Sequence, residues 1–223
     1  MKLYKVFFIS ALIIFVLSAS AQKETNPDGE ENGMRYLLEG DLNISGFGGV
    51  TVGFSPVEGE TAVSVGGGGA ALINQKFFIG GYGQGIATKH ERADITINGE
   101  YIDDAVLQFG HGGMWLGYIV YPAKVLHMNI NTKIGAGSLS LTESLDEYEM
   151  MESYHEDMVI VLTPSVGINL NVLEWFRISA NAGYRYVGGV GNKTYDNSSE
   201  LIFDGQDYNA PVFSLSFLFG GFH

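Results

Sequence analysis

The sequence predicts an all-β fold, an eight-stranded antiparallel transmembrane β-barrel with short periplasmic turns and long extracellular loops. Three observations support this prediction. Long segments alternate between apolar and polar side chains, 31 of the 223 residues are glycine, and no spanning apolar run follows the N-terminal segment. In a transmembrane barrel, backbone groups pair between strands while alternate side chains face lipid and lumen.

The first 21 residues are expected to be a cleaved signal peptide. Lys2 and Lys5 precede an apolar stretch, and Ala19-Ser20-Ala21 matches the small-residue pattern of a cleavage site. The apolar stretch is too short for a spanning helix, which needs about 20 residues. The expected organisation is a signal peptide (1–21), an N-terminal periplasmic lead or strand extension (22–44), and the barrel (45–223).

The first four strands are predicted over 49–55, 62–73, 77–88 and 104–121. The first two alternate apolar residues with glycine, serine or threonine, which gives each strand one apolar face. The other two carry apolar and glycine residues on both faces, so their faces are left unassigned. The adjacent glycines are expected to let strands bend and to make room for large neighbouring side chains in a narrow barrel.

Three later segments, 126–140, 158–172 and 176–186, alternate most clearly. Because an eight-stranded barrel has an interior just wide enough for side chains, their polar faces are expected to form a hydrogen-bonded lumen network. The predicted network residues are His127, Asn129, Asn131, Lys133, Asn169, Asn171, Arg177, Asn181 and Arg185. No inward carboxylate on these strands matches the three cations, which leaves water, a loop acid or an anionic ligand as their partners.

The predicted connections sort by length into two groups. Residues 74–76, 121–124 and 173–175 form short turns, whereas 89–103, 142–157 and 188–210 form long loops. Short turns face the periplasm in such barrels, and an even strand count places both ends of the barrel on that side. Phe77, Tyr121, Trp175 and Phe176 lie beside the short turns and are expected to form an aromatic girdle.

Several glycine-rich stretches carry a family resemblance: Gly46-Phe47-Gly48-Gly49, Gly59-Glu60, Gly66–Gly69 and Phe77–Gly83. The chain resembles the small eight-stranded outer-membrane barrels of Gram-negative bacteria, which include OmpA-type and OmpX-type barrels, and is similar to uncharacterised barrels of that kind. The resemblance implies an outer-membrane location and transfers no catalytic residue.

The last segment, 211–222, resembles the closing strand of those barrels. The resemblance implies that its alternating apolar face is an assembly signal for the barrel-assembly machinery, although the chain continues to His223 after its last aromatic residue. The implied signal residues are Phe213, Leu215, Phe217 and Phe219.

The predicted role is structural or surface-interacting, with a plugged polar lumen and acidic extracellular loops. One alternative is a narrow porin-like passage or binding site for small solutes, including anions. A lipid-modifying enzyme is a third, but no nucleophile-elbow motif and no spacing that demands a Ser–His pair is present, so catalysis is not predicted. No cofactor is expected, and a soluble periplasmic β-sandwich is the main alternative fold.

The loop 142–157 is strongly acidic and contains no Lys or Arg. Its simplest interpretation is a solvated loop. A sharper one is a divalent-cation site, with Glu143, Asp146, Glu147 and Glu149 as candidate ligands, bridging the protein to outer-membrane lipids and lipopolysaccharide. Loss of Lys2 and Lys5 with the signal makes the formal net charge more negative than −13, which argues against nucleic-acid binding.

Overall fold

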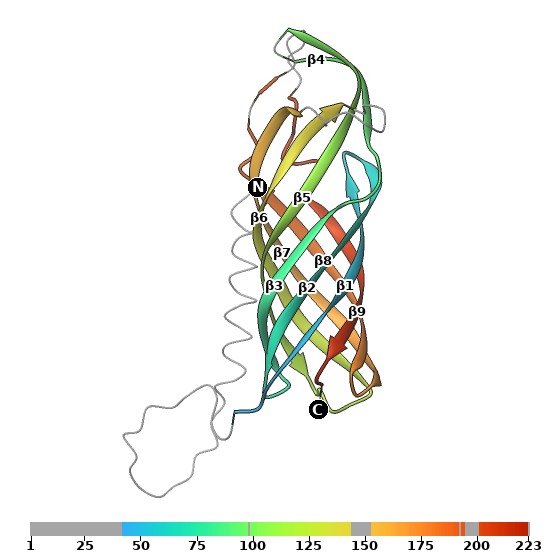
Figure 1. The fold of residues 1–223 in the computed structure, drawn as a ribbon, viewed down its shortest axis with the longest axis vertical. Helices are drawn as coiled ribbons and strands as arrows, with labels where there is room; N and C mark the ends of the chain where they lie inside the picture. The colour runs from blue at the N-terminus through green and yellow to red at the C-terminus, as the bar shows by residue number, and fades with distance from the viewer. Residues whose placement is uncertain (1–41, 98, 144–152, 192, 195–200, 223) are drawn as a thin grey trace, which may run out of the picture. The chain divides into compact units, whose positions relative to one another are not determined.

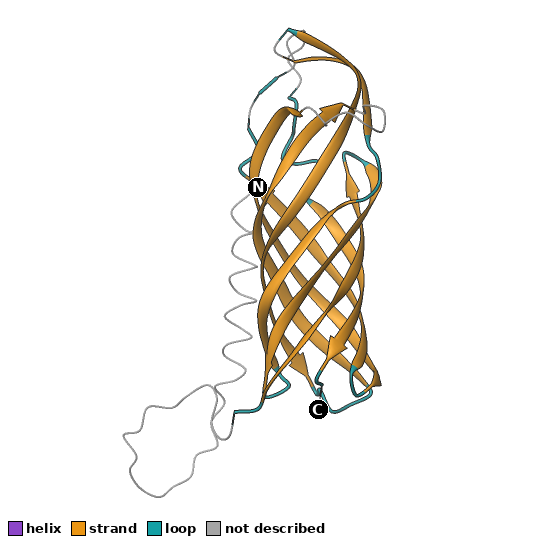
Figure 2. Ribbon diagram, viewed as in Figure 1, coloured by secondary structure: helices purple, strands orange, loops and turns teal. Residues whose placement is uncertain are grey.

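The computed structural model describes residues 42–97, 99–143, 153–191, 193–194 and 201–222. All regular elements in this part of the chain are strands (Figure 2). No described helix is long and apolar enough to cross a membrane. The strands are β1 (Ile44–Val57), β2 (Glu60–Ile73), β3 (Phe77–Ile86), β4 (Glu91–Ile97), β5 (Glu100–Val120), β6 (Leu126–Glu143), β7 (Ser153–Leu173), β8 (Phe176–Gly188) and β9 (Ala210–Gly220).

The strands close into a ring (Figure 1). Neighbours pair antiparallel in the order β3-β2-β1-β9-β8-β7-β6-β5, and β3 also pairs with β5 from Phe77↔Tyr118 to Gly85↔Gly110. β4 pairs with β5, outside this ring. The closed barrel therefore has eight strands, which confirms the predicted fold class. Closure pairs the strand backbones around the whole ring, as a membrane-spanning sheet requires.

The segment 89–103, predicted to be a loop, is instead mostly a β-hairpin. β4 pairs with the first part of β5 from Glu91↔Val106 to Ile97↔Glu100, and Gly99 has φ +83°. The sequence Asn98-Gly99, which follows the β-branched run Ile95-Thr96-Ile97, is the strongest short hairpin signal, and it outweighs the polar composition of the segment. The hairpin lies at the end of the barrel opposite the C-terminus (Figure 1).

The turn between β1 and β2, at the same end as the hairpin, is also short. Glu58 and Gly59 have φ +51° and +81°, the positive pair that a two-residue hairpin turn needs. β6 and β7 extend into the predicted loop 142–157, of which 144–152 lie outside the described residues. The connection between β8 and β9 is long, as predicted.

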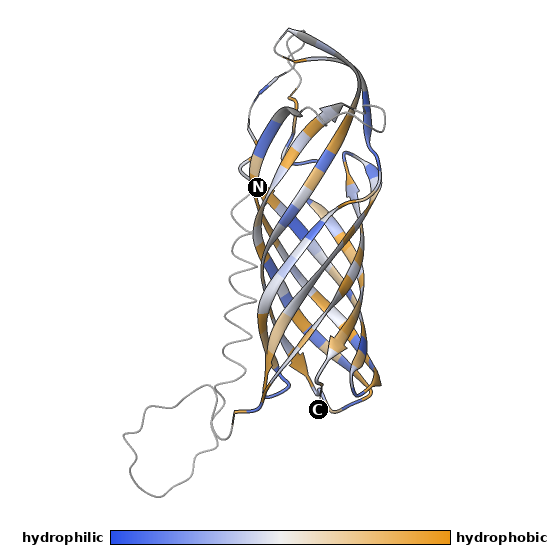
Figure 3. Ribbon diagram, viewed as in Figure 1, coloured by the Kyte–Doolittle hydropathy of each residue, from blue (hydrophilic) through white to orange (hydrophobic). Residues whose placement is uncertain are grey.

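Hydrophobic and hydrophilic residues are interspersed along the strands (Figure 3), and the hydrophobic side chains that are exposed lie on the outer surface of the barrel. Large hydrophobic side chains on its strands are between 38% and 80% exposed. They include Val50, Phe54, Val65, Ile79, Met114, Ile134, Met158, Ile168, Phe213 and Phe219. An apolar face of this size is not stable in water, and an apolar band around a closed antiparallel barrel is the surface that contacts lipid. The chain is therefore a transmembrane barrel of the outer-membrane type.

The interior contains two apolar clusters. At the short-turn end, Phe47, Phe78 and Trp115 pack edge to face, with ring centroids 5.2–5.6 Å apart. Gly117 makes this packing possible, because a Cβ there would lie 2.2 Å from the Phe78 ring. The second cluster fills the opposite end and includes Leu107, Leu139, Leu141, Val159, Val161, Ile202, Phe203 and Tyr208. Polar side chains lie inside the barrel between and beside these clusters.

Candidate functional site in the barrel lumen

The nine residues predicted for the lumen point inward on β6, β7 and β8. His127, Asn129, Asn131, Asn169, Arg177 and Arg185 are buried, whereas Lys133, Asn171 and Asn181 are half-buried. Each strand alternates, so the apolar residues between them face outward on the same strands. The structure thus brings all nine into one interior, where each is held by different neighbours.

Four asparagines form a hydrogen-bonded ladder across three strands. Asn131 donates through Nδ2 to Oδ1 of Asn129 (2.6 Å) and of Asn181 (3.1 Å). Asn129 donates to Oδ1 of Asn169 at 2.9 Å, and Asn181 donates to the hydroxyl of Ser179 at 3.1 Å. The amides satisfy one another inside the barrel, which offsets the cost of burying them.

Lys133 begins a directed chain of hydrogen bonds. Its ammonium donates to Oε1 of Gln84 at 3.1 Å, and Nε2 of Gln84 lies 3.1 Å from Nε2 of His111. Because an ammonium can only donate and an amide nitrogen can only donate, His111 Nε2 must accept. The proton is therefore on Nδ1 of His111, which lies 3.0 Å from the hydroxyl of Tyr82. The chain holds His111 as one neutral tautomer.

Arg185 is held entirely by neutral groups. Its guanidinium donates to the carbonyl of Tyr208 (2.9 Å), the hydroxyl of Ser55 (3.0 Å) and the carbonyl of Pro56 (3.1 Å). It also lies over the ring of Phe109, with Cζ 5.1 Å from the centroid. This one side chain connects β8 to β1 and to the segment before β9.

Arg177 and His127 occupy the short-turn end. Arg177 donates to Oδ1 of Asn171 at 2.7 Å and lies over the ring of Phe222, 4.0 Å from its centroid. His127 donates through Nδ1 to the carbonyl of Lys124 at 2.9 Å. Its Nε2 is buried and has no hydrogen-bond partner among the described residues.

Residues 201–209 pack against the apolar cluster at the other end of the barrel, a feature absent from the sequence prediction. Ile202, Phe203 and Tyr208 are at most 1% exposed. The hydroxyl of Tyr208 donates to Glu58 at 2.6 Å, and Arg92 pairs with Glu58 and donates to the carbonyl of Ile202. Burial and the hydrogen bond to the Glu58 carboxylate raise the pKa of Tyr208 above its ordinary value. In the sequence, the large apolar residues Ile202, Phe203 and Tyr208 within a mostly polar connection were the signal that could have indicated this packing.

A hydroxyl, an imidazole and a carboxylate line up near the strand break before β4. Thr88 Oγ1 lies 3.1 Å from His90 Nε2, and His90 Nδ1 lies 3.2 Å from Glu60 Oε2. This order is the one that acyl-transfer enzymes use. However, Thr88 Oγ1 already accepts the Val63 backbone N–H, and the Glu60 side chain is 74% exposed. We therefore interpret these hydrogen bonds as a structural contact between β2 and the segment before β4, and assign no catalytic role to them.

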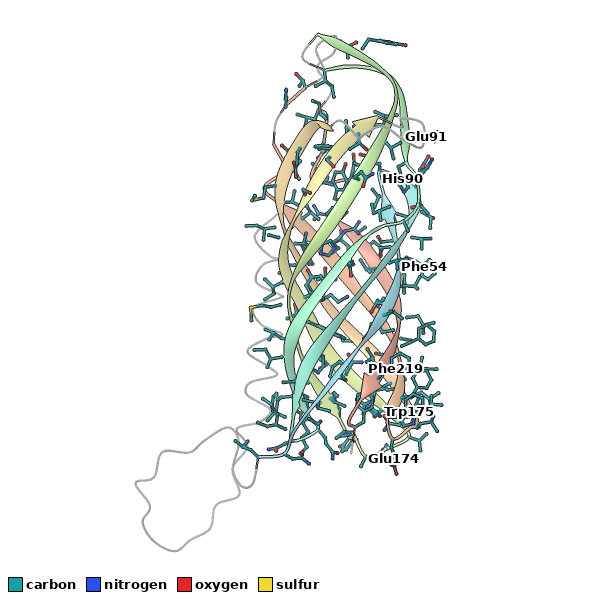
Figure 4. The ribbon with its side chains drawn as sticks, viewed as in Figure 1. Phe54, His90, Glu91, Glu174, Trp175 and Phe219 are labelled. Carbon is teal, nitrogen blue, oxygen red and sulfur yellow. The ribbon has the colours of Figure 1, made fainter. Side chains whose placement is uncertain are left out.

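The residues of the predicted assembly signal lie on β9. Phe213, Leu215 and Phe219 are exposed on the outer face, and Phe217 is half-buried. Phe219 stacks on Phe176 at 5.1 Å and on Trp175 at 6.2 Å. Figure 4 shows Trp175, Phe219 and Glu174 at one end of the barrel and His90 and Glu91 at the other. Trp175 and Phe176, two of the four residues expected to form a girdle, therefore contact the closing strand beside the short turn between β7 and β8.

The central part of the acidic loop, 144–152, lies outside the described residues. Asp146, Glu147 and Glu149 lie outside the described residues, as does the side chain of Glu143. Within the described residues, no group of three or more His, Asp or Glu side chains is close enough to hold a metal ion.

Comparisons with known proteins give weak similarities of fold. No protein-family model matches the sequence, and no curated protein matches it significantly. The structure of Neisserial surface protein A (NspA) has a TM-score of 0.47 and 11% identity, covering 82% of this chain and all of that one. The structure of Ail, the attachment invasion locus protein of Yersinia pestis, has a TM-score of 0.44 and 12% identity, covering 79% of this chain and 97% of that one. The N-terminal β-barrel domain of Pseudomonas aeruginosa OprF has a TM-score of 0.39 and 11% identity, covering 78% of this chain and 96% of that one.

Proposed function

We propose that this outer-membrane barrel is a closed, non-conducting protein with a structural or surface-interaction role. The observation that carries the proposal is the burial of Ile202, Phe203 and Tyr208 in the mouth of the lumen, at most 1% exposed. When a connection between strands buries large apolar side chains in the mouth of a barrel, those side chains fill the lumen and do not line a passage. Function then depends on the outer surface and the extracellular end.

The rest of the lumen supports the same role. Below the mouth, the asparagine ladder joins β6, β7 and β8 through their side chains. At the short-turn end, the cluster of Phe47, Phe78 and Trp115 occupies the interior. An eight-stranded barrel leaves little room beyond its own side chains, so these layers leave small cavities of ≈30 Å³ and ≈10 Å³.

The proposed partners are those of a surface-exposed barrel. The apolar outer face binds outer-membrane lipids, and the outward residues of β9 are read by the barrel-assembly machinery. Divalent cations at the acidic loop bridge the protein to lipopolysaccharide. For this last partner, replacement of Glu143, Asp146, Glu147 and Glu149 by Gln is expected to remove the calcium dependence of lipopolysaccharide association. If lipopolysaccharide association did not depend on calcium in the wild-type protein or in this variant, the proposed cation bridge would be contradicted.

The closed lumen is tested by conductance in planar lipid bilayers. The purified, folded protein is expected to insert without discrete conductance steps, while a reconstituted porin in the same membranes serves as the positive control. Reproducible ion-conducting steps from the wild-type protein would contradict the closed lumen. They would favour the alternative of a narrow passage for small solutes, for which the interior cations provide the one supporting observation.

A further inference from the structure

Three cations lie inside this barrel without a carboxylate. Lys133, Arg177 and Arg185 form no ion pair with any described residue, and their hydrogen bonds go to amide, hydroxyl and carbonyl oxygens. Burial of a charge without an opposite charge is costly, because the interior responds to it less than water does. The lumen therefore has an unbalanced positive charge.

Lys133 has donor hydrogens without a described acceptor. Its ammonium has three donor hydrogens, and one described hydrogen-bond acceptor, Oε1 of Gln84 at 3.1 Å. The nitrogen also lies 5.1 Å and 5.7 Å from the ring centroids of Tyr82 and Trp115. Aromatic faces attract a cation weakly and accept no conventional hydrogen bond, so donor capacity remains.

An interior cavity lies against this group. Its volume is ≈30 Å³, and its walls include Lys133, Arg185, Gln84, Asn131, Asn181 and Trp115. A space of this size holds at least one water-sized occupant, and therefore also a monatomic ion. Because Lys133 and Arg185 on its walls are positively charged, the cavity favours an anion.

We propose that this cavity binds one halide-sized monatomic anion, chloride under ordinary conditions, as the internal counter-ion of Lys133 and Arg185. The anion completes the donor capacity of the ammonium and balances the charge of the closed lumen. This proposal rests on the closed lumen of the proposed function and adds a ligand to it. An anion held in this way is a structural ion and does not pass through the barrel.

The two tryptophans allow a direct test. Trp115 lines the cavity, whereas Trp175 is 57% exposed on the outside of the barrel. In a Trp175→Phe protein, Trp115 is the single tryptophan reporter. The protein is refolded separately in mixtures of sodium bromide and sodium gluconate at constant sodium concentration, so that slow entry into a closed lumen does not hide binding.

Bound bromide is expected to quench Trp115 fluorescence along a saturating curve, and added chloride is expected to reverse the quenching by competition. Quenching that rises linearly with bromide and ignores chloride would overturn the proposal and indicate water alone in the cavity. This test uses no substitution at the site. A gel-mobility shift between unboiled and boiled samples shows in each case that the barrel has folded.

Two further variants assign the site to Lys133. Lys133→Met is expected to weaken bromide affinity by about tenfold or more, since a buried charge loses its partner. Lys124→Met is the matched control, because Lys124 lies over Tyr121 in a short turn (4.9 Å), and its affinity is expected to be unchanged. Gln84→Glu supplies a carboxylate beside Lys133 and is expected to abolish saturable quenching. Saturable quenching of equal affinity in all of these folded variants would overturn the assignment.

Discussion

The hydroxyl of Tyr208 donates a hydrogen bond of 2.6 Å to the carboxylate of Glu58, a residue 150 positions earlier in the chain. Glu58 lies in the turn between β1 and β2, and Tyr208 lies just before β9. Arg92, from β4, binds the same carboxylate. Three separate segments therefore meet at one group, and this contact holds the connection 201–209 in the mouth of the barrel.

Tyr208→Phe is expected to lower the free energy of unfolding by about 1.5 kcal/mol, because a buried hydrogen bond to a charged acceptor is lost while the ring remains. Urea unfolding in lipid vesicles measures the change. Tyr184→Phe is the matched control, since its hydroxyl donates to the carbonyl of Asn209 at an exposed position. Equal losses in the two variants would show that the contact does not hold the mouth closed.

The mouth also predicts a pH effect through Asp207. Partial burial and the nearby carboxylates of Asp204 and Glu58 raise the pKa of Asp207, and Arg92 opposes this. The native state therefore binds this proton more readily than the unfolded state, and ionised Asp207 costs stability at neutral pH. That cost disappears as the pH falls through the raised pKa.

Asp207→Asn is accordingly expected to be more stable than the wild type at neutral pH, with the difference shrinking toward zero in acid. Urea unfolding at several pH values measures it. Glu174→Gln, in the short turn at the opposite end, controls for the change of net charge. A gain for Asp207→Asn that persists unchanged in acid would be inconsistent with this origin.

Arg185→Lys tests the connection between β8, β1 and the mouth. A lysine keeps the charge but cannot reproduce the planar fork, so acceptors among Ser55, Pro56 and Tyr208 lose their donor. The expected loss is at least about 2 kcal/mol. Arg177→Lys is expected to lose less, because one hydrogen bond, to Asn171, is described for that side chain. The reverse order would contradict the assigned contacts.

The outer surface is tested by placing a charge on it. Ile134 is 43% exposed on β6, and Val125 is 67% exposed beside the short turn before that strand. In a bilayer, Ile134→Lys is expected to cost about 2–4 kcal/mol and Val125→Lys about 0–1 kcal/mol, because the penalty falls toward the interface. Similar small effects at both positions would mean that Ile134 faces water.

The sequence predicted the parts of the fold in which polarity alternates without interruption. On β6, Asn129 and Asn131 are buried while Met128 and Ile130 are exposed, because the pleat sends successive side chains to opposite faces. The inward and outward faces of β3 and β5 were not assigned from the sequence, because their many glycines have no side chain that marks a face. Gln84 and His111, which complete the Lys133 chain, come from those two strands.

The remaining differences have separate causes. The hairpin of β4 and β5 was not predicted because the segment 89–103 was assigned as a long connection between two strands, although Asn98-Gly99 is a strong turn signal. The mouth segment was predicted only as part of the long loop 188–210, and the burial of Phe203 and Tyr208 depends on Glu58 and Arg92, which are distant in sequence. Contacts of this kind follow from closure of the barrel, and local sequence patterns do not encode them.

The most direct test of the account is fractionation of expressing cells followed by gel electrophoresis of unboiled and boiled samples. A closed membrane-spanning barrel is expected in the outer-membrane fraction, with a mobility in detergent that changes on boiling as the paired strands unfold. Soluble periplasmic protein with the same mobility before and after boiling would contradict a membrane barrel and make the apolar outer face part of a different assembly.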